Sequence, residues 1–276
     1  MRVFRSLAVS SLVVMVTIGA AAAQDSPATA AQEAPKPYEP QVGQSGKDVV
    51  WVPSPQALVD RMLDMASVKV DDYVVDLGSG DGRTVITAAK RGVKAKGIEF
   101  NPDLVELSKR NAVAAGVTDL ATFVNGDIFE TDFSDATVVT MFLLSHLNLK
   151  LQPTLLNMKP GTRLVSNSFD MGDWEPDDRI NAENCTSYCR AMFWIVPAKV
   201  AGTWRLPQGD LTLQQKFQML MGTLKTSSGT TNITNGKMRG DQITFMVGDR
   251  VYRGKVNGNS MEGVFAAETK WQATRR

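Results

Sequence analysis

The chain has few of the residues from which metal centres and disulfide frameworks are built. Its 276 residues include one histidine, His146, and two cysteines, Cys185 and Cys189. The cysteines stand four positions apart and the histidine is distant from them in sequence, so the set lacks the spacing of a zinc site. We therefore expect no metal in this protein.

An excess of charge of one sign is also lacking. Thirty basic residues against 29 acidic residues leave a formal net charge of +1. Proteins that hold nucleic acid through its phosphates usually show a basic face or stripe. The balance therefore argues against a nucleic-acid partner, although it leaves room for a local basic patch.

Long apolar runs are confined to the N-terminus. Arg2 and Arg5 precede an apolar stretch from Leu7 to about Ala22, and Ala23 precedes Gln24. A basic segment, an apolar segment and a small-residue cleavage site are the parts of a secretory signal peptide. We predict a signal peptide over residues 1–23 and a periplasmic or secreted protein without a further membrane span. An uncleaved membrane anchor and a mitochondrial transit peptide are the alternatives.

The next segment, residues 24–47, is rich in Pro, Ala, Gln and Ser and has few large apolar residues. Such a segment cannot bury enough surface to order itself, so it predicts a disordered linker. Further along, Cys185 and Cys189 in "NCTSYCR" are candidates for a short-loop disulfide in an exported chain. Two reduced thiols are the competing interpretation.

Two patterns divide the remaining chain. Between residues 48 and 200, short apolar runs that end in turns alternate with segments of helical periodicity, which indicates βα units and a parallel, Rossmann-like α/β sheet. From residue 201 to 276, short alternating runs are cut by turns such as "NG" and "NGN". This second pattern predicts an antiparallel β domain of six to eight strands, either a small sandwich or an open barrel.

The stretch "DLGSGDG" places Gly78, Gly80 and Gly82 between a predicted strand and a predicted helix. Glycines there permit a sharp turn and let a ligand touch the backbone. The spacing is G-x-G-x-G rather than the G-x-G-x-x-G of dinucleotide-binding loops. Asp76 precedes the first glycine by two residues, and its charge would repel a pyrophosphate but suit a cationic amine.

Two further acids follow the next two predicted strands. Glu99 can accept the hydroxyls of a ribose, and Asp127 can accept the exocyclic amine of an adenine. Taken singly, each residue also fits a tight turn or a helix cap. Together, a cationic amino acid, a ribose and an adenine describe S-adenosylmethionine.

The motifs "VVDLGSGDGR", "GIEFNP" and "GDIF" resemble the cofactor motifs of class I S-adenosylmethionine-dependent methyltransferases. With "VWVPSPQALVDRML" and "TMFLL", residues 48–178 more narrowly resemble the small protein-lysine methyltransferases of mitochondrial inner-membrane proteins, and distantly the Dot1-type enzymes. The export signal and the segment after residue 200 depart from that family. The resemblance implies that the methionine end, the ribose, the adenine and an N-terminal flap are contacted by Asp76, Gly78, Ser79, Gly80, Glu99, Asp127, Ile128, Val52, Pro53 and Ser54.

The methyl acceptor is less clearly specified. "TMFLLSHLN" lacks the Asn/Asp-Pro-Pro-aromatic tetrapeptide of many enzymes that methylate adenine bases, which counts against a nucleic-acid substrate. Met141 and Phe142 fall where the acceptor amine should arrive, but they also fit a buried strand end. His146 is either a general base or a packing residue at a helix start, and "DWEPDD" either attracts a basic substrate or forms a solvated loop.

The sequence thus predicts a methyltransferase that acts on an amine, with a protein lysine as the favoured acceptor and no assigned catalytic residue. A non-catalytic exported ligand-binding protein that retains the fold is one alternative. A small-molecule methyltransferase is the other.

Overall fold

The computed structural model describes residues 8–15, 37–265 and 269–276. The chain divides into two units, Met1–Pro37 and Tyr38–Arg276. Apart from residues 8–15, which form no helix or strand, the predicted signal peptide, its cleavage site and the linker up to residue 36 lie outside the described residues. Within the described ranges, no helix combines the length and the apolar character needed to cross a membrane.

Residues 38–47 differ from the predicted disordered linker. The Gly43 amide donates to the Trp51 carbonyl at 2.9 Å, the Trp51 amide donates to the Gln44 carbonyl at 2.9 Å, and Ser45 forms a β-bridge with Val50. Composition predicted disorder because this segment has few apolar residues of its own. Its order comes from hydrogen bonds to residues further along the chain, so the folded domain begins about ten residues before residue 48.

The first part of the folded unit is a seven-stranded sheet in the order β3-β2-β1-β4-β5-β7-β6. The pairs among β1 to β5 are parallel, whereas β7 runs antiparallel to both β5 and β6. This is the predicted Rossmann-like fold, with β6 as a strand that the sequence pattern did not indicate. The strands are β1 (Tyr73–Leu77), β2 (Lys94–Glu99), β3 (Ala121–Asn125), β4 (Val138–Met141), β5 (Arg163–Asn167), β6 (Asp178–Asn181) and β7 (Arg190–Ile195).

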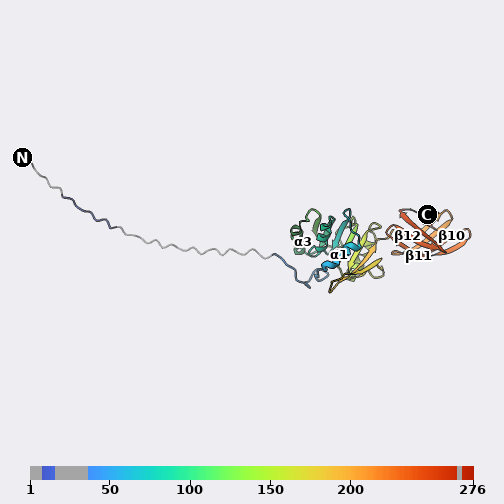
Figure 1. Ribbon diagram of the computed structural model, residues 1–276, viewed down its shortest axis with the longest axis horizontal. Coiled ribbons are helices and arrows are strands. Elements are labelled where there is room, and N and C mark those ends of the chain that lie inside the picture. The colour runs from blue at the N-terminus through green and yellow to red at the C-terminus, as the bar shows by residue number, and fades with distance from the viewer. Residues whose placement is uncertain (1–7, 16–36, 266–268) are drawn as a thin grey trace, which may run out of the picture. The chain divides into compact units, whose positions relative to one another are not determined.

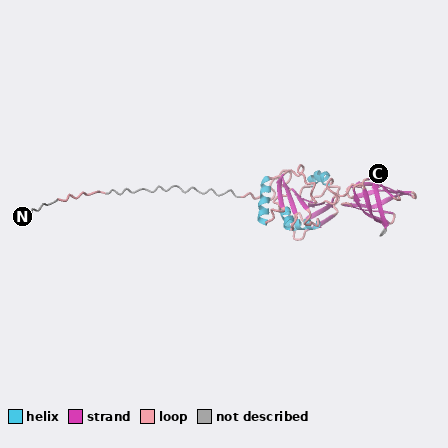
Figure 2. Cartoon of the chain, turned by 90° about the horizontal axis from the view of Figure 1, so that it is seen from above, coloured by secondary structure: helices cyan, strands magenta, loops and turns pink. Residues whose placement is uncertain are grey.

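Helices cover both faces of this sheet, because its central strands are apolar on both sides. On β1, Val74 packs into a core with α1 (Gln56–Met65), α2 (Arg83–Lys90) and α3 (Pro102–Ala115). The next residue, Val75, packs into a second core with α4 (Ser145–Leu155). Figures 1 and 2 show these helices beside the strands of the sheet.

Helix α3 begins and ends at residues typical of helix ends. The side chain of Asn101 accepts a hydrogen bond from the Asp103 amide at 2.9 Å, and Pro102 occupies the first helical position. Gly116 ends the helix in a left-handed conformation with φ of 67°. Because α3 begins three residues after the end of β2, the helix start also holds the backbone at Glu99 in place.

The second part of the folded unit is a closed antiparallel barrel of eight strands in the order β10-β11-β12-β13-β14-β15-β8-β9. The prediction of a sandwich or open barrel is corrected here, because β9 pairs with β10 along eight residues and β15 pairs with β8, which leaves no free edge. The strands are β8 (Gly202–Leu206), β9 (Gly209–Lys216), β10 (Met219–Thr226), β11 (Gly229–Arg239), β12 (Gln242–Val247), β13 (Arg250–Asn257), β14 (Ser260–Phe265) and β15 (Thr269–Arg275).

Aromatic side chains fill the barrel. The rings of Phe245 and Tyr252 stack with centroids 4.8 Å apart, and Trp271 meets both edge-on. Trp204 is fully buried in the same core. Figure 2 shows the described part of this domain as strands joined by short loops. Its interior is therefore a packed core rather than a ligand cavity.

The acidic stretch "DWEPDD" lies between the sheet and the barrel. Lys237 of β11 forms an ion pair with the buried carboxylate of Asp177 at 3.0 Å, and Lys216 pairs with Asp173 at 3.0 Å. The ring of Trp174 stacks on Phe217 with centroids 5.8 Å apart. Asp173 and Asp177 thus contact lysines of the barrel, whereas Glu175 pairs with Arg179 of β6. Contact with the barrel is a third role for this stretch, beside the two alternatives that the sequence left open.

Candidate active site

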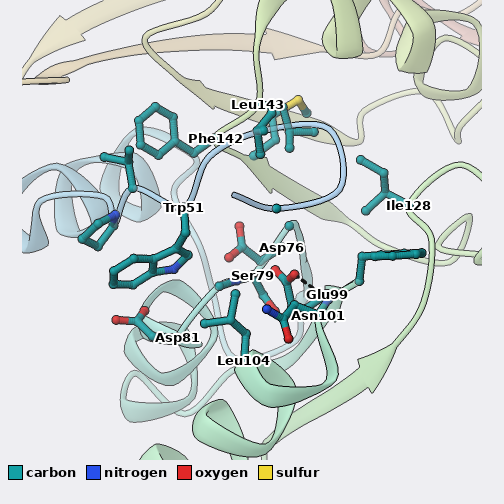
Figure 3. Close-up of a pocket in the computed structure, with 18 of the residues that line it drawn as sticks. Trp51, Asp76, Ser79, Asp81, Glu99, Asn101, Leu104, Ile128, Phe142 and Leu143 are labelled. Carbon is teal, nitrogen blue, oxygen red and sulfur yellow. Dashed lines mark hydrogen bonds between the residues drawn. The ribbon is translucent and has the colours of Figure 1, made fainter. Parts of the chain in front are cut away.

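A pocket lies at the carboxyl ends of the parallel strands β1, β2 and β4, which is where open α/β sheets bind ligands. Residues 44–54, which we call the strap, form one wall. Figure 3 shows Phe142 and Leu143 at one end of the view, Asp81 and Leu104 at the other, and Asp76, Ser79 and Glu99 between them. All ten residues that the sequence predicted to contact a cofactor line this pocket: Val52, Pro53, Ser54, Asp76, Gly78, Ser79, Gly80, Glu99, Asp127 and Ile128.

The glycine loop turns sharply between β1 and α2. Gly78, Gly80 and Gly82 have φ angles of 74°, 55° and 81°, a left-handed region that other residues rarely adopt. A Cβ atom on Gly80 would lie 2.9 Å from the indole nitrogen of Trp51. The strap residue Trp51 therefore leaves no room for a side chain at position 80.

Asp76 is the most perturbed acid of the site. Its side chain is buried at the end of β1 and accepts a hydrogen bond from the Thr140 hydroxyl at 2.6 Å. Burial raises the pKa of Asp76 to about 7, hydrogen bonds from Thr140 and Thr84 oppose the rise, and the nearby charges of Glu99 and Asp81 add to it. A bound cation would favour the ionised form of Asp76.

Glu99 is held by two backbone amides. One carboxylate oxygen accepts from the Gly80 amide at 2.9 Å, and the other accepts from the Asn101 amide at 2.9 Å. Glu99 can therefore both fix the turn and bind a ribose, because each carboxylate oxygen keeps a further lone pair. The contact also ties the second strand to the glycine loop.

Asp127 is bound by a lysine that sequence reasoning missed. The Lys47 ammonium lies 2.5 Å from Oδ2 of Asp127, and it lies 4.7 Å from the ring centroid of Phe100. The hydrogen bond from Lys47 lowers the pKa of Asp127, and the same hydrogen bond raises the pKa of Lys47. The acid expected to accept an adenine amine thus bonds to the strap in this structure.

The glycine loop beside the pocket contains a polar side-chain atom without a hydrogen-bond partner. The Ser79 hydroxyl is buried and has no hydrogen-bond partner among the described residues. This oxygen lies against β2, where a Cβ atom on Gly97 would come within 2.4 Å of it. The groups that face a ligand are therefore the buried carboxyl of Asp76 and the carboxylate of Glu99, which suit a charged amino acid joined to a sugar.

The apolar end of the pocket is formed by the residues that follow β4. Met141 is fully buried, Phe142 is half-buried and Leu143 is buried, and all three line the pocket. His146 is exposed on the first turn of α4 and is not among the lining residues, so its position does not favour the role of a base. Sequence reasoning did not select Trp51, Asp81 or Leu104, although Trp51 lies in "VWVPSPQALVDRML" and Asp81 in "DLGSGDG".

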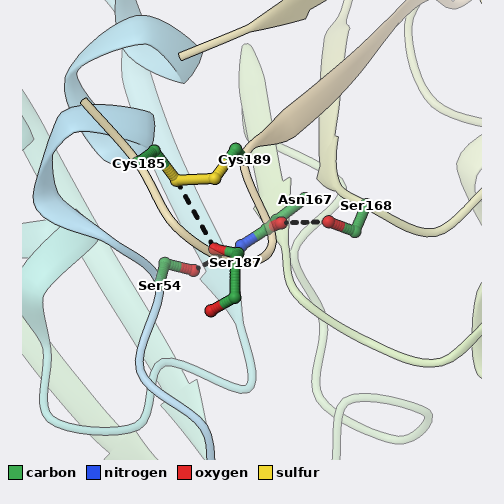
Figure 4. The surroundings of a disulfide bond; sticks show 6 residues. All are labelled: Ser54, Asn167, Ser168, Cys185, Ser187 and Cys189. Atoms are coloured by element: carbon green, nitrogen blue, oxygen red, sulfur yellow. Dashed lines mark hydrogen bonds between the residues drawn. A yellow bond between two sulfur atoms is a disulfide. The ribbon is translucent and has the colours of Figure 1, made fainter. Parts of the chain in front are cut away.

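The structure joins Cys185 to Cys189 in a disulfide, in the turn that leads into β7. The alternative of two reduced thiols does not describe this structure. Figure 4 shows this turn beside Ser54 of the strap and Asn167 at the end of β5, whose side-chain amide donates to the Ser54 hydroxyl at 3.0 Å.

Comparison with known proteins gives consistent relatives. The ANTKMT methyltransferase domain family matches residues 76–178. A protein-lysine N-methyltransferase of Saccharolobus islandicus is 48% identical over 139 residues, which cover 49% of this chain and 86% of that protein. The adenine nucleotide translocase lysine N-methyltransferase of Mus musculus is 36% identical over 105 residues, which cover 37% of this chain and 46% of that protein.

Among solved structures, a protein from Salinibacter ruber described as an RNA methyltransferase in complex with S-adenosyl-L-homocysteine is 47% identical. It superimposes with a TM-score of 0.51 and covers 54% of this chain and 96% of that chain. The chain therefore spans most of the Saccharolobus and Salinibacter proteins, but less than half the length of the mouse enzyme.

Proposed function

Because the chain belongs to the family of S-adenosylmethionine-dependent protein-lysine N-methyltransferases, we propose that it methylates lysine side chains of a protein acceptor. S-adenosylmethionine is its cofactor. The observation that carries the proposal is the pocket, where the buried carboxyl of Asp76 and the carboxylate of Glu99 lie side by side, as an amino acid joined to a ribose requires.

Different residues of the pocket would bind different parts of the cofactor. Asp76 would hold the α-ammonium, because a buried carboxyl with a raised pKa gains most from a cationic partner. Glu99 would accept the ribose hydroxyls with the lone pairs that its two backbone hydrogen bonds leave free. Asp127 would receive the adenine amine once Lys47 releases it.

When bound, the cofactor supplies a methyl group on a cationic sulfur. The lone pair of a neutral lysine amine forms a bond to the methyl carbon, the carbon–sulfur bond breaks, and the sulfonium becomes a thioether. A lysine arrives as an ammonium with a pKa near 10.4, and it must release a proton to solvent before it can react. The apolar end formed by Met141, Phe142 and Leu143 removes water from the amine and so lowers its pKa. Positioning and exclusion of water are thus the main contributions of this chain.

A basic protein segment suits the charge of the domain that holds the pocket. Residues 38–200 contain 16 basic and 22 acidic residues, whereas residues 201–276 contain 11 basic and five acidic ones. The name of the Salinibacter relative makes RNA the second candidate acceptor. The acidic surroundings of the pocket favour a protein lysine over a polyanion.

We also propose that the mature protein works outside the cytoplasm. The N-terminal features of a signal peptide and the pairing of Cys185 with Cys189 support this, because disulfides persist in oxidising compartments. Fractionation of tagged cells and N-terminal sequencing test it. A mature chain that begins at Gln24 is expected, whereas an intact Met1 in a membrane fraction would favour the anchor.

The decisive experiment combines binding and transfer. The chain from Gln24 is titrated with S-adenosylhomocysteine in a calorimeter, and methyl transfer from labelled S-adenosylmethionine to envelope proteins is then located by mass spectrometry. Label on lysine supports the proposal. Binding without transfer favours the ligand-binding alternative, label on small molecules alone favours the other alternative, and label on RNA replaces lysine as the acceptor.

A further inference from the structure

Three aromatic rings meet beside the pocket. Phe142 follows β4, Phe169 follows β5 and Tyr188 precedes β7, and these three strands are neighbours in the sheet. The ring centroids of Phe142 and Tyr188 are 5.1 Å apart, those of Phe142 and Phe169 are 6.0 Å apart, and those of Phe169 and Tyr188 are 6.4 Å apart. We call these three residues the aromatic cluster.

The cluster is continuous with the pocket, because Phe142 belongs to both. The glycine loop, Glu99 and Asp127 take the other side of the pocket, at the ends of β1, β2 and β3. The cluster therefore borders the apolar end of the pocket, beside the ends of β4 and β5. No part of the assigned cofactor site uses Phe169 or Tyr188.

The backbone of Phe169 is fixed by buried polar groups. Its carbonyl accepts hydrogen bonds from the Ser166 hydroxyl at 2.7 Å and from the Asn148 amide at 3.1 Å. Asn148 and Ser166 are both fully buried. These hydrogen bonds fix the position of the Phe169 backbone, from which the ring projects.

Tyr188 is placed differently. It is 43% exposed and has a φ angle of 52°, a conformation that a tyrosine adopts only where its surroundings impose it. The disulfide between Cys185 and Cys189 closes the turn around it, and the Cys185 sulfur contacts the Ser187 carbonyl at 3.4 Å. Figure 4 shows this turn beside Ser54 of the strap and Asn167.

We propose that the aromatic cluster is the acceptor subsite, which holds the side chain of the substrate lysine; this inference rests on the proposed function. Ring faces attract a cation and pack well against a methylene stem. They also stabilise the positive charge that returns to the nitrogen when the methyl group is transferred. The exposed ring of Tyr188 is the part that a substrate can cover, and the disulfide holds that ring in place.

The test uses the chain from Gln24 and two synthetic peptides of glycine and lysine. One peptide carries free lysine as methyl acceptor, and the other carries trimethyllysine, which binds as a cation but cannot be methylated. Tyr188→Ala is compared with Tyr188→Phe, with the double variant Cys185→Ser/Cys189→Ser, and with Val113→Ala, an exposed apolar control on α3.

We expect Tyr188→Ala to raise KM for the lysine peptide about 3- to 30-fold, the range of a cation–π contact, with a smaller change in kcat. Tyr188→Phe should stay within about twofold, because the ring face is kept. The double serine variant should shift KM in the same direction as Tyr188→Ala. Binding of S-adenosylhomocysteine should be unchanged in all of these variants, which shows that they are folded.

The outcomes separate the two proposals. If the lysine peptide is methylated and Tyr188→Ala leaves KM unchanged, the subsite is refuted while the function stands. If the wild type methylates no lysine but binds the trimethyllysine peptide in a Tyr188-dependent way, the subsite stands and the function falls. If neither peptide interacts, or if Tyr188→Ala impairs methylation of an RNA oligonucleotide instead, the lysine subsite is overturned.

Discussion

Replacing Asp76 by asparagine should make the cofactor-free protein more stable and the cofactor site weaker. The folded-state pKa is about 7 against an ordinary value of 3.8, a rise of about 3 units. At 1.36 kcal/mol per unit, keeping Asp76 ionised in the cofactor-free protein costs up to about 4 kcal/mol. Asparagine keeps an oxygen for the Thr140 hydroxyl and removes the charge.

The sign of the pH dependence follows from the raised pKa. Between about pH 4 and pH 7 the native protein holds a proton on Asp76 that the unfolded chain has lost. The free energy of unfolding therefore falls as the pH rises through this window, and Asp76→Asn lacks that fall. The variant should match the wild type near pH 4 and exceed it in stability at pH 8.

Binding should show the opposite effect. At pH 6 a group with a pKa of about 7 is roughly one-tenth ionised, so affinity for S-adenosylhomocysteine should be about tenfold below its value with Asp76 fully ionised. Asp76→Asn should bind weakly and lose this dependence on pH below 7.

Urea denaturation at pH 4 and pH 8 and calorimetric titrations at pH 6 and pH 8 measure both effects, with Asp119→Asn as an exposed control. A variant that keeps the pH dependence of the wild type would refute the titration of Asp76. A variant with wild-type affinity would remove Asp76 from the cofactor site.

Three further predictions concern the strap and the contact between the domains. Gly80→Ala should lower stability by about 1–2 kcal/mol in thermal melts, because of its left-handed backbone and the strap indole beside it, and calorimetry should show weaker cofactor binding. Lys47→Met should bind S-adenosylhomocysteine several-fold more tightly at low salt, since it frees Asp127; unchanged affinity would contradict a competing contact. Lys237→Ala should cost about 1–3 kcal/mol in urea denaturation, because it removes the cation beside the buried carboxylate of Asp177, which keeps the hydrogen bond from the Ile195 amide.

The sheet and most of the pocket were predictable because their signals are local. Each of Asp76, Glu99 and Asp127 stands at or just after the end of a strand, and parallel strands bring such ends to one edge. Helix α3 carries its own start and stop residues. Such features need only neighbours in sequence, so the pattern sufficed without knowledge of distant contacts.

The strap was predictable only in part. Val52, Pro53 and Ser54 were expected over the pocket, but Lys47 contacts Asp127 across 80 positions of sequence. No local pattern marks a lone lysine as the partner of a distant acid. The closure of the barrel was hidden for the same reason, since alternation predicts strands but not the pairing of β8 with β15.

Net charge was the least informative of the sequence features, because opposite charges are segregated. The acidic excess of residues 38–200 cancels the basic excess of residues 201–276, and a chain of balanced charge thus contains two domains of opposite sign. Ion pairs from Lys216 and Lys237 to the acidic loop use part of that basic charge within the molecule. The remaining basic residues leave the barrel able to attract an anionic partner. A value near zero for the whole chain is therefore no ground for excluding RNA, and the expectation of no nucleic-acid partner has to rest on the acidic surroundings of the pocket.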